Sequence, residues 1–192
     1  GSFLVAARYS FFHLVAGSVL DRQIPRNLDV HAKFSAALRP GHRLSVLGGL
    51  GDERMDSRES DDPLEDFTLR TSGRTTVVSA RLDSALGTRA TLSSTASYSA
   101  VRDQFDLHGA VKTDARGVAR YSLGNNGSIV DVVYDRAVAV QDWAVRQELS
   151  VLPSSRHALD AGFEAHALVT GWRWSIDGER SQDVSSRMLP WP

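Results

Sequence analysis

The stretch LDVHAKFSA, residues 28–36, decides the fold because its apolar and polar side chains alternate without a break. Every second residue is apolar, and the residues between them are Asp29, His31, Lys33 and Ser35. A period of two places the two sets on opposite faces of a β-strand. This stretch therefore predicts a strand with one apolar face and one polar face.

The same alternation recurs along the chain, in pairs of segments joined by short turns near residues 40, 86 and 154. Gly, Pro and Ser residues gather at two of these turns, and Gly87 closes the third. The pattern predicts seven strands, at residues 3–9, 28–36, 44–50, 78–83, 90–100, 143–151 and 159–167.

The connections between these strands alternate in length. A short turn joins the two strands of each pair. The other connections, residues 10–27, 52–67 and 104–128, are long polar links. This parity is typical of transmembrane barrels, which have short turns on one side and long loops on the other. The predicted fold is all-β: an antiparallel up-and-down meander, a partial segment of a large transmembrane β-barrel, with residues 1–192 in one barrel domain. A soluble β-sandwich module remains an alternative, because its inner faces alternate in the same way.

If the apolar face contacts lipid, the other face must line a water-filled lumen, as in a wide or plugged barrel. The residues predicted to face this lumen are Asp29, His31, Lys33, Arg81, Asp83, Arg146, Glu148, Asp160, Glu164 and His166. Glu164 and His166 share a strand face and are expected to form a hydrogen-bonded pair rather than a metal site.

Several aromatic residues lie near predicted strand ends, where a girdle at the membrane surface would place them. They are Tyr9, Tyr98, Trp143, Trp172 and Trp174. Ordinary core or edge packing is the alternative interpretation of each.

Composition excludes several functions. The chain has no Cys, which excludes disulfide bonds and a thiol nucleophile. Its net charge of −1 lacks the basic excess that nucleic-acid binding requires. The apolar run at residues 3–20 contains Arg8 and His13, which argues against a membrane-spanning helix. No G-x-S-x-G, H-E-x-x-H or P-loop motif occurs, so we expect neither an enzyme nor a resident cofactor or metal.

The strand count indicates a piece of a longer protein, since seven is odd and bacterial barrels have even counts. Residues 181–187 have loop composition, so no closing strand is expected here.

Several segments resemble barrel strands of TonB-dependent outer-membrane receptors. They are residues 3–15, 28–33 and 39–48, together with the hairpin formed by residues 145–149 and 156–164, which carries the pattern H-x-L-x-x-G-x-E. The resemblance implies a barrel of about 22 strands in the bacterial outer membrane. It also implies an N-terminal plug and closing strands, neither of which is recognisable in these residues.

The resemblance further implies energy supply from TonB through the plug, and uptake of a scarce small-molecule ligand of the siderophore, cobalamin or glycan class. Residues near 52–67, 104–128 and 172–183 are the candidates for ligand capture. A passive porin-like barrel remains an alternative function.

Overall fold

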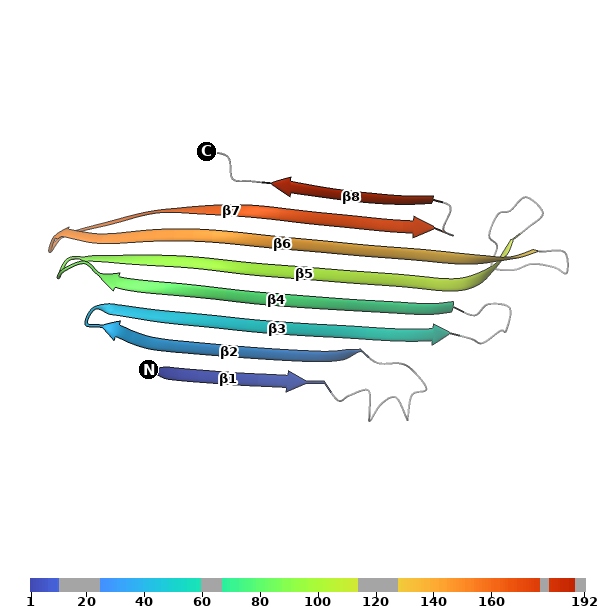
Figure 1. The fold of residues 1–192 in the computed structure, drawn as a ribbon, viewed down its shortest axis with the longest axis horizontal. Coiled ribbons are helices and arrows are strands. Elements are labelled where there is room, and N and C mark those ends of the chain that lie inside the picture. Colours follow the sequence, from blue (N-terminus) through green and yellow to red (C-terminus); the bar gives the residue numbers. More distant parts are fainter. Residues whose placement is uncertain (11–24, 60–66, 114–127, 177–179, 189–192) are drawn as a thin grey trace.

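The computed structural model describes residues 1–10, 25–59, 67–113, 128–176 and 180–188. Its elements are β1 (Ser2–Tyr9), β2 (Arg26–Arg39), β3 (His42–Glu59), β4 (Phe67–Ala85), β5 (Ala90–Thr113), β6 (Ser128–Ser154), β7 (His157–Ile176) and β8 (Arg180–Met188). Each strand pairs antiparallel with the next, in one open sheet with β1 and β8 at its edges (Figure 1). The predicted antiparallel meander is confirmed.

The sheet is a single layer. Among the described residues only Ala144 and Ser84 are buried, and every described strand belongs to this one sheet. The second packed sheet of a β-sandwich is therefore missing from the described ranges. Phe34, which would sit in the interior of such a sandwich, has 49% of its surface exposed.

Three short turns lie together at one end of the sheet, called the turn end below (Figure 1). Gly41 and Gly87 have φ angles of 77° and 76° in the first two, a region that residues with a Cβ rarely adopt. The third turn joins β6 to β7 near Ser154. All three match the predicted positions. The opposite end, called the link end, leads into residues 11–24, 60–66, 114–127 and 177–179, which lie outside the described residues.

The strands at the link end are longer than predicted. β3 continues to Glu59 and β4 begins at Phe67, while β5 continues to Thr113 and β6 begins at Ser128. Much of the predicted links at 52–67 and 104–128 is therefore strand. The predicted strands ended where apolar residues stopped alternating on one face. The backbone hydrogen bonds between strands continue beyond that point, because they do not depend on which face is apolar.

The sheet has eight described strands, one more than the seven counted from the sequence. Arg180–Met188 forms β8 and pairs with β7 over nine residue pairs, from Leu168 with Met188 to Ile176 with Arg180. Residues 181–187 lack apolar alternation, so composition alone suggested a loop, but backbone hydrogen bonds need no apolar side chain. With eight described strands, the inference from an odd count no longer follows.

Candidate functional site

The register aligns side chains into two continuous faces, because residues directly opposite each other on paired strands point to the same side. We name them the Phe34 face and the Lys33 face. All ten residues predicted to face the lumen lie on the Lys33 face, for example Arg146 opposite Glu164 and Ser150 opposite Asp160. The structure thus brings the predicted polar set together on one surface.

Toward the turn end, the Lys33 face is held by polar contacts. Arg81 Nε donates to Asp83 Oδ1 at 2.8 Å, and Ser150 Oγ donates to Asp160 Oδ1 at 2.5 Å. Arg146 forms an ion pair with Glu148. These contacts run along and across the strands, so the charged side chains here are largely paired with each other.

His166 lies between two carboxylates on this face. Its Nδ1 is 3.0 Å from Asp142 Oδ2, and its Nε2 is 3.2 Å from Glu164 Oε1. The predicted pairing of Glu164 with His166 is thereby confirmed, and Asp142 is a partner that the sequence did not indicate. In the described ranges, no group of three or more His, Asp or Glu side chains is arranged to hold a metal ion.

The Phe34 face toward the turn end is apolar, and we call this region the apolar band. Phe163, Leu159 and Trp143 have 61%, 59% and 57% of their surfaces exposed. Other large side chains of the band are Phe3, Val5, Val30, Phe34, Val46, Leu50, Val78, Leu82, Leu92, Val145 and Leu149. Monomeric proteins rarely leave an apolar surface this extensive in water.

Polar groups inside the apolar band satisfy each other. Ser94 Oγ donates to Gln147 Oε1 at 2.8 Å across β5 and β6. A pair of this kind reduces the cost of placing either group against hydrocarbon, where an unsatisfied polar group costs several kcal/mol.

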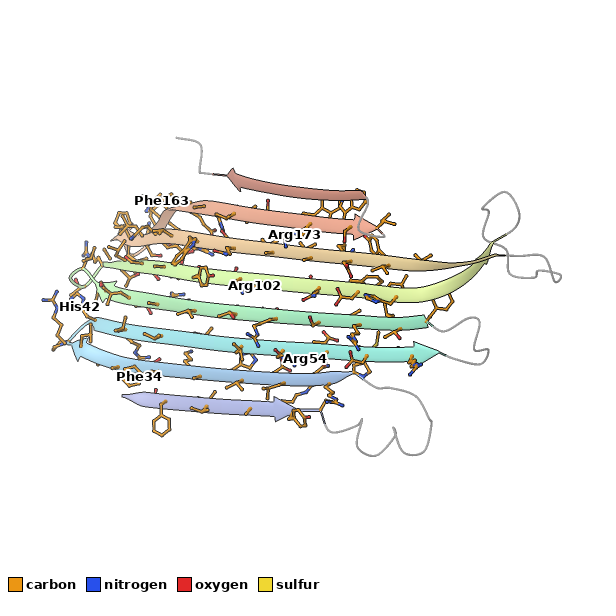
Figure 2. All side chains as sticks on the ribbon, turned by 45° about the vertical axis from the view of Figure 1, so that its right-hand side comes forward. Phe34, His42, Arg54, Arg102, Phe163 and Arg173 are labelled. Atoms are coloured by element: carbon orange, nitrogen blue, oxygen red, sulfur yellow. The ribbon has the colours of Figure 1, made fainter. Side chains whose placement is uncertain are left out.

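Polarity on the Phe34 face changes abruptly toward the link end. On β3 the apolar positions end at Leu50 and are followed by Asp52 and Arg54; on β4, Val78 and Thr76 give way to Arg74. Figure 2 shows Arg54, Arg102 and Arg173 displaced from Phe34 and Phe163 toward the link end. The apolar band therefore covers only part of each long strand.

The Lys33 face changes in the opposite sense. Toward the link end it carries an aromatic cluster, which we define as Phe67, Phe105, Tyr134, Trp172 and Trp174. The rings of Phe105 and Tyr134 meet edge-on, with centroids 5.8 Å apart, and Arg136 Cζ lies 5.7 Å from the centre of the Phe105 ring. Trp172 has 41% of its surface exposed, so the cluster is accessible.

The five aromatic residues predicted to lie at the membrane surface divide between the two faces of the sheet. Tyr9, Tyr98 and Trp143 lie on the Phe34 face, but Trp172 and Trp174 lie on the Lys33 face, opposite Val138 and Arg136. Trp172 and Trp174 occupy positions of even number in β7, whereas the apolar set there has odd numbers. The position of an aromatic residue near a strand end did not show to which face of the sheet its side chain points.

The predicted strands did not include Phe67, Phe105, Tyr134 and Arg136, because these residues fall within predicted links or beyond predicted strand ends. The alternation of Phe105 and Leu107 with Asp106 and His108 was the available signal. This alternation indicates a strand in which the odd-numbered residues are apolar. In the preceding part of β5 the even-numbered residues are apolar, so the apolar side chains move to the other face.

Asp52 lies at the border of the apolar band. Arg54 Nε and Arg74 Nη2 both lie 3.0 Å from its carboxylate oxygens. The hydrogen bond from Arg74 is the main cause that holds the pKa of Asp52 below its ordinary value, and partial desolvation opposes the shift. The carboxylate is thus charged over a wider pH range than usual.

The similarity to one solved structure, that of FyuA, supports the fold. The ferric yersiniabactin uptake receptor FyuA from Yersinia pestis is similar over 86% of this chain, with a TM-score of 0.57 and 9% sequence identity. The siderophore receptor PiuA from Acinetobacter baumannii matches over 85% of the chain at 12% identity, with a TM-score of 0.33.

The chain spans 24% of the FyuA chain and 32% of the PiuA chain. No protein-family model and no curated protein matches the sequence. The described ranges contain no helix with the length and hydropathy of a membrane span. The architecture is that of a segment of an outer-membrane β-barrel, eight antiparallel strands in one up-and-down sheet.

Proposed function

We propose that this chain is part of a bacterial outer-membrane receptor that actively takes up a scarce ligand, with energy supplied through TonB. Its partners are outer-membrane lipid around the barrel, the remaining strands and a plug that contacts TonB. The ligand belongs to the siderophore, cobalamin or glycan class. FyuA is described as an uptake receptor for ferric yersiniabactin, which supports an uptake role for a chain of this fold.

The observation that carries the proposal is the exchange of polarity between the two faces. About 9–11 tilted residues cross a bilayer, whereas β6 has 27 residues. A strand that is apolar outside over one part and polar outside over the next fits a barrel that extends beyond the membrane. A soluble sheet has no reason to exchange the polarity of its two faces partway along several neighbouring strands.

The ten polar residues of the Lys33 face support a wide, hydrated bore. Their charges are mostly paired, as in Arg81 with Asp83 and Arg146 with Glu148. Under this proposal Asp29, His31 and Lys33 line the same bore on β2, where they face the plug.

The aromatic cluster is the proposed ligand-capture surface. It lies on the inward face beyond the membrane, where a ligand arriving from outside first meets the bore. Tyr and Trp rings offer flat surfaces for aromatic chelating groups, corrin or sugar rings. Arg136 adds a cation beside Phe105, which suits an anionic ligand such as a ferric chelate.

Binding to the purified full-length protein in detergent tests this site. We expect one of three probes, a ferric catecholate siderophore, cyanocobalamin or maltohexaose, to quench tryptophan fluorescence saturably. Replacing both Trp172 and Trp174 with Ala should weaken that binding at least tenfold. Trp143→Phe is the matched control and should leave the affinity unchanged, because Trp143 lies on the opposite face. No saturable binding of any probe, or equal loss in the control, would contradict the proposal.

Cellular uptake separates active from passive transport. Uptake of the identified ligand should cease when TonB is deleted or the proton gradient is collapsed. Uptake that persists under both conditions would instead support the porin-like alternative. Outer-membrane fractionation of the full-length protein checks the location itself, and recovery in the soluble fraction would overturn the proposal.

A further inference from the structure

The apolar band is long enough to cross a membrane, and it ends at the turns (Figure 1). On β5 and β6 it runs from Tyr98 opposite Trp143 to Ala90 opposite Val151, nine residues on each strand. About 9–11 residues of a tilted strand cross the hydrocarbon of a bilayer. With Tyr98 and Trp143 at one membrane surface, the turn end therefore lies at the other.

Each of the three turns carries an exposed leucine at the end of the apolar band. The exposed fractions of these side chains are 60% for Leu38, 50% for Leu86 and 52% for Leu152. Backbone hydrogen bonds of 2.7 Å join neighbouring turns, from Ala85 N to Gly41 O and from Leu152 N to Arg89 O. The leucines are therefore held at fixed places along the turn end, where they extend the apolar surface to its limit.

The turns carry positive charge and no negative charge. The segments at residues 37–43, 84–91 and 150–158 contain no Asp or Glu. Each segment contains an exposed arginine that forms no ion pair within the residues that the structure describes. These arginines, called the rim arginines below, are Arg39, Arg89 and Arg156. All three turns are therefore cationic.

The carboxylates nearest to the turns in the described strands do not neutralise the rim arginines. They lie on the Lys33 face, and they are Asp83, Glu148 and Asp160. Arg81 donates to the first, and Arg146 forms an ion pair with the second. Arg43 lies on the same face, directly opposite Asp83. These three arginines equal the three carboxylates in number, so the charge of the rim arginines is in excess.

The excess of positive charge is clearest at the second and third turns. Arg39 lines a groove of about 860 Å³ together with the three carboxylates, whereas Arg89 and Arg156 do not line it. Arg89 and Arg156 are therefore the rim arginines on which a test should rest.

The opposite border of the apolar band carries charges of both signs. Asp52 lies there between Arg54 and Arg74, 3.0 Å from a nitrogen of each. Asp56 and Asp106 continue the same face toward the link end. Charge of a single sign is therefore a feature of the turns and not of that border.

We infer that the turn end binds anionic phospholipid in the leaflet that it borders, with the leucines against the acyl chains and the rim arginines on the phosphates. This inference rests on the proposed function, because it requires the apolar band to lie in the membrane. Short turns of bacterial barrels lie on the periplasmic side, so the leaflet concerned is the inner one.

Two features favour an anionic lipid over other ligands. Guanidinium groups bind phosphate oxygens in pairs. Because the rim has excess positive charge, it favours a lipid of net negative charge over phosphatidylethanolamine, whose ammonium group balances its phosphate. The exposed leucines beside the arginines favour a lipid over a free phosphate, which has no acyl chain to cover them.

The test uses the full-length protein in nanodiscs of phosphatidylethanolamine that contain a small fraction of phosphatidylglycerol, with native mass spectrometry counting retained lipids. We expect the wild type to retain phosphatidylglycerol preferentially. An arginine near an anionic lipid surface contributes about 1 kcal/mol, so Arg89→Gln and Arg156→Gln should each lower this retention about fivefold. Leu86→Ser should also lower it, because the change removes an apolar contact without altering any charge.

Arg8→Gln is the matched control. Arg8 is exposed and forms no ion pair within the described residues, but it lies on the Lys33 face opposite Asp29, at the end of β1 away from the turns. Its replacement removes one positive charge and should leave the retention of phosphatidylglycerol unchanged. Heat-modifiable migration on gels verifies that each variant is folded.

Equal retention of the two lipids by the wild type would overturn the inference, as would equal losses in Arg89→Gln and Arg8→Gln. Displacement of phosphatidylglycerol by glycerol 1-phosphate at equal concentration, or unchanged retention in Leu86→Ser, would also overturn it, because either result indicates a site for the free headgroup. If the wild type still fractionates with the outer membrane, the proposed function survives these results. Absence from that fraction would overturn both.

Discussion

Tyr98 and Trp143 face each other directly across β5 and β6, with ring centroids 4.3 Å apart and planes tilted by 42°. The pair lies on the Phe34 face near the border of the apolar band toward the link end, with Tyr98 four residues before Arg102 on β5. Amphipathic aromatic rings favour the boundary between hydrocarbon and headgroups. This single contact therefore marks the level at which we expect the membrane surface.

The position of Trp143 predicts quenching by lipid. In reconstituted full-length protein that retains one tryptophan, brominated lipids should quench fluorescence strongly when it is Trp143 and weakly when it is Trp172. The reason is that the two side chains point to opposite faces. Steady-state quenching in proteoliposomes measures this difference. Stronger quenching of Trp172 would contradict the assignment of faces.

Neighbouring residues on β7 predict a difference in access to water. Phe163 lies on the Phe34 face and Glu164 on the Lys33 face. In a cysteine-free background, Glu164→Cys should react readily with a water-soluble maleimide in proteoliposomes, whereas Phe163→Cys should stay unlabelled. Gel-shift labelling is the measurement, and both cysteines should react after solubilisation in denaturant. Faster labelling of Phe163→Cys in lipid would contradict a lipid-facing Phe34 face.

The contact between Phe67 and Gly109 predicts strong coupling within the aromatic cluster. A Cβ added at Gly109 would clash with the Phe67 ring, so Gly109→Ala must displace that ring. Overpacking of this kind costs about 1–3 kcal/mol. In a Phe67→Ala background the same change should be neutral or slightly stabilising. A double-mutant cycle on thermal unfolding measures the coupling, and additive effects would show that the ring does not occupy this position.

Sequence alone established the meander because the residues between Leu28 and Ala36 alternate strictly, and their partners Val46 and Leu50 repeat the pattern. The prediction from sequence failed where the apolar residues move from one face of a strand to the other. Asp52 and Arg54 continue the same strand and face as Leu50, but polar residues at positions expected to be apolar were taken as a loop. The face of Trp172 and the pairing of β8 depend on cross-strand register, which only the neighbouring strand supplies.

The ion pairs of Asp52 predict a pH dependence of stability. Because the folded-state pKa of Asp52 is lowered, mainly by Arg74, its charge stabilises the fold fully above the unfolded-state pKa. That stabilisation is lost as the pH falls through the folded-state pKa. Asp52→Asn should therefore lower stability at neutral pH by about 0.5–1 kcal/mol, typical of partly exposed pairs. The difference from wild type should disappear in strong acid.

Asp56→Asn is the matched control for this pH dependence. Asp56 lies on the same strand and face, but Arg70 Nε is 3.8 Å away and both side chains are more than 60% exposed. Its removal should change stability little at any pH. Thermal unfolding of the detergent-solubilised full-length protein across a pH series measures both variants. If the two variants show the same pH profile, the shared contacts of Asp52 with Arg54 and Arg74 do not supply the stabilisation, because Asp56 lacks them.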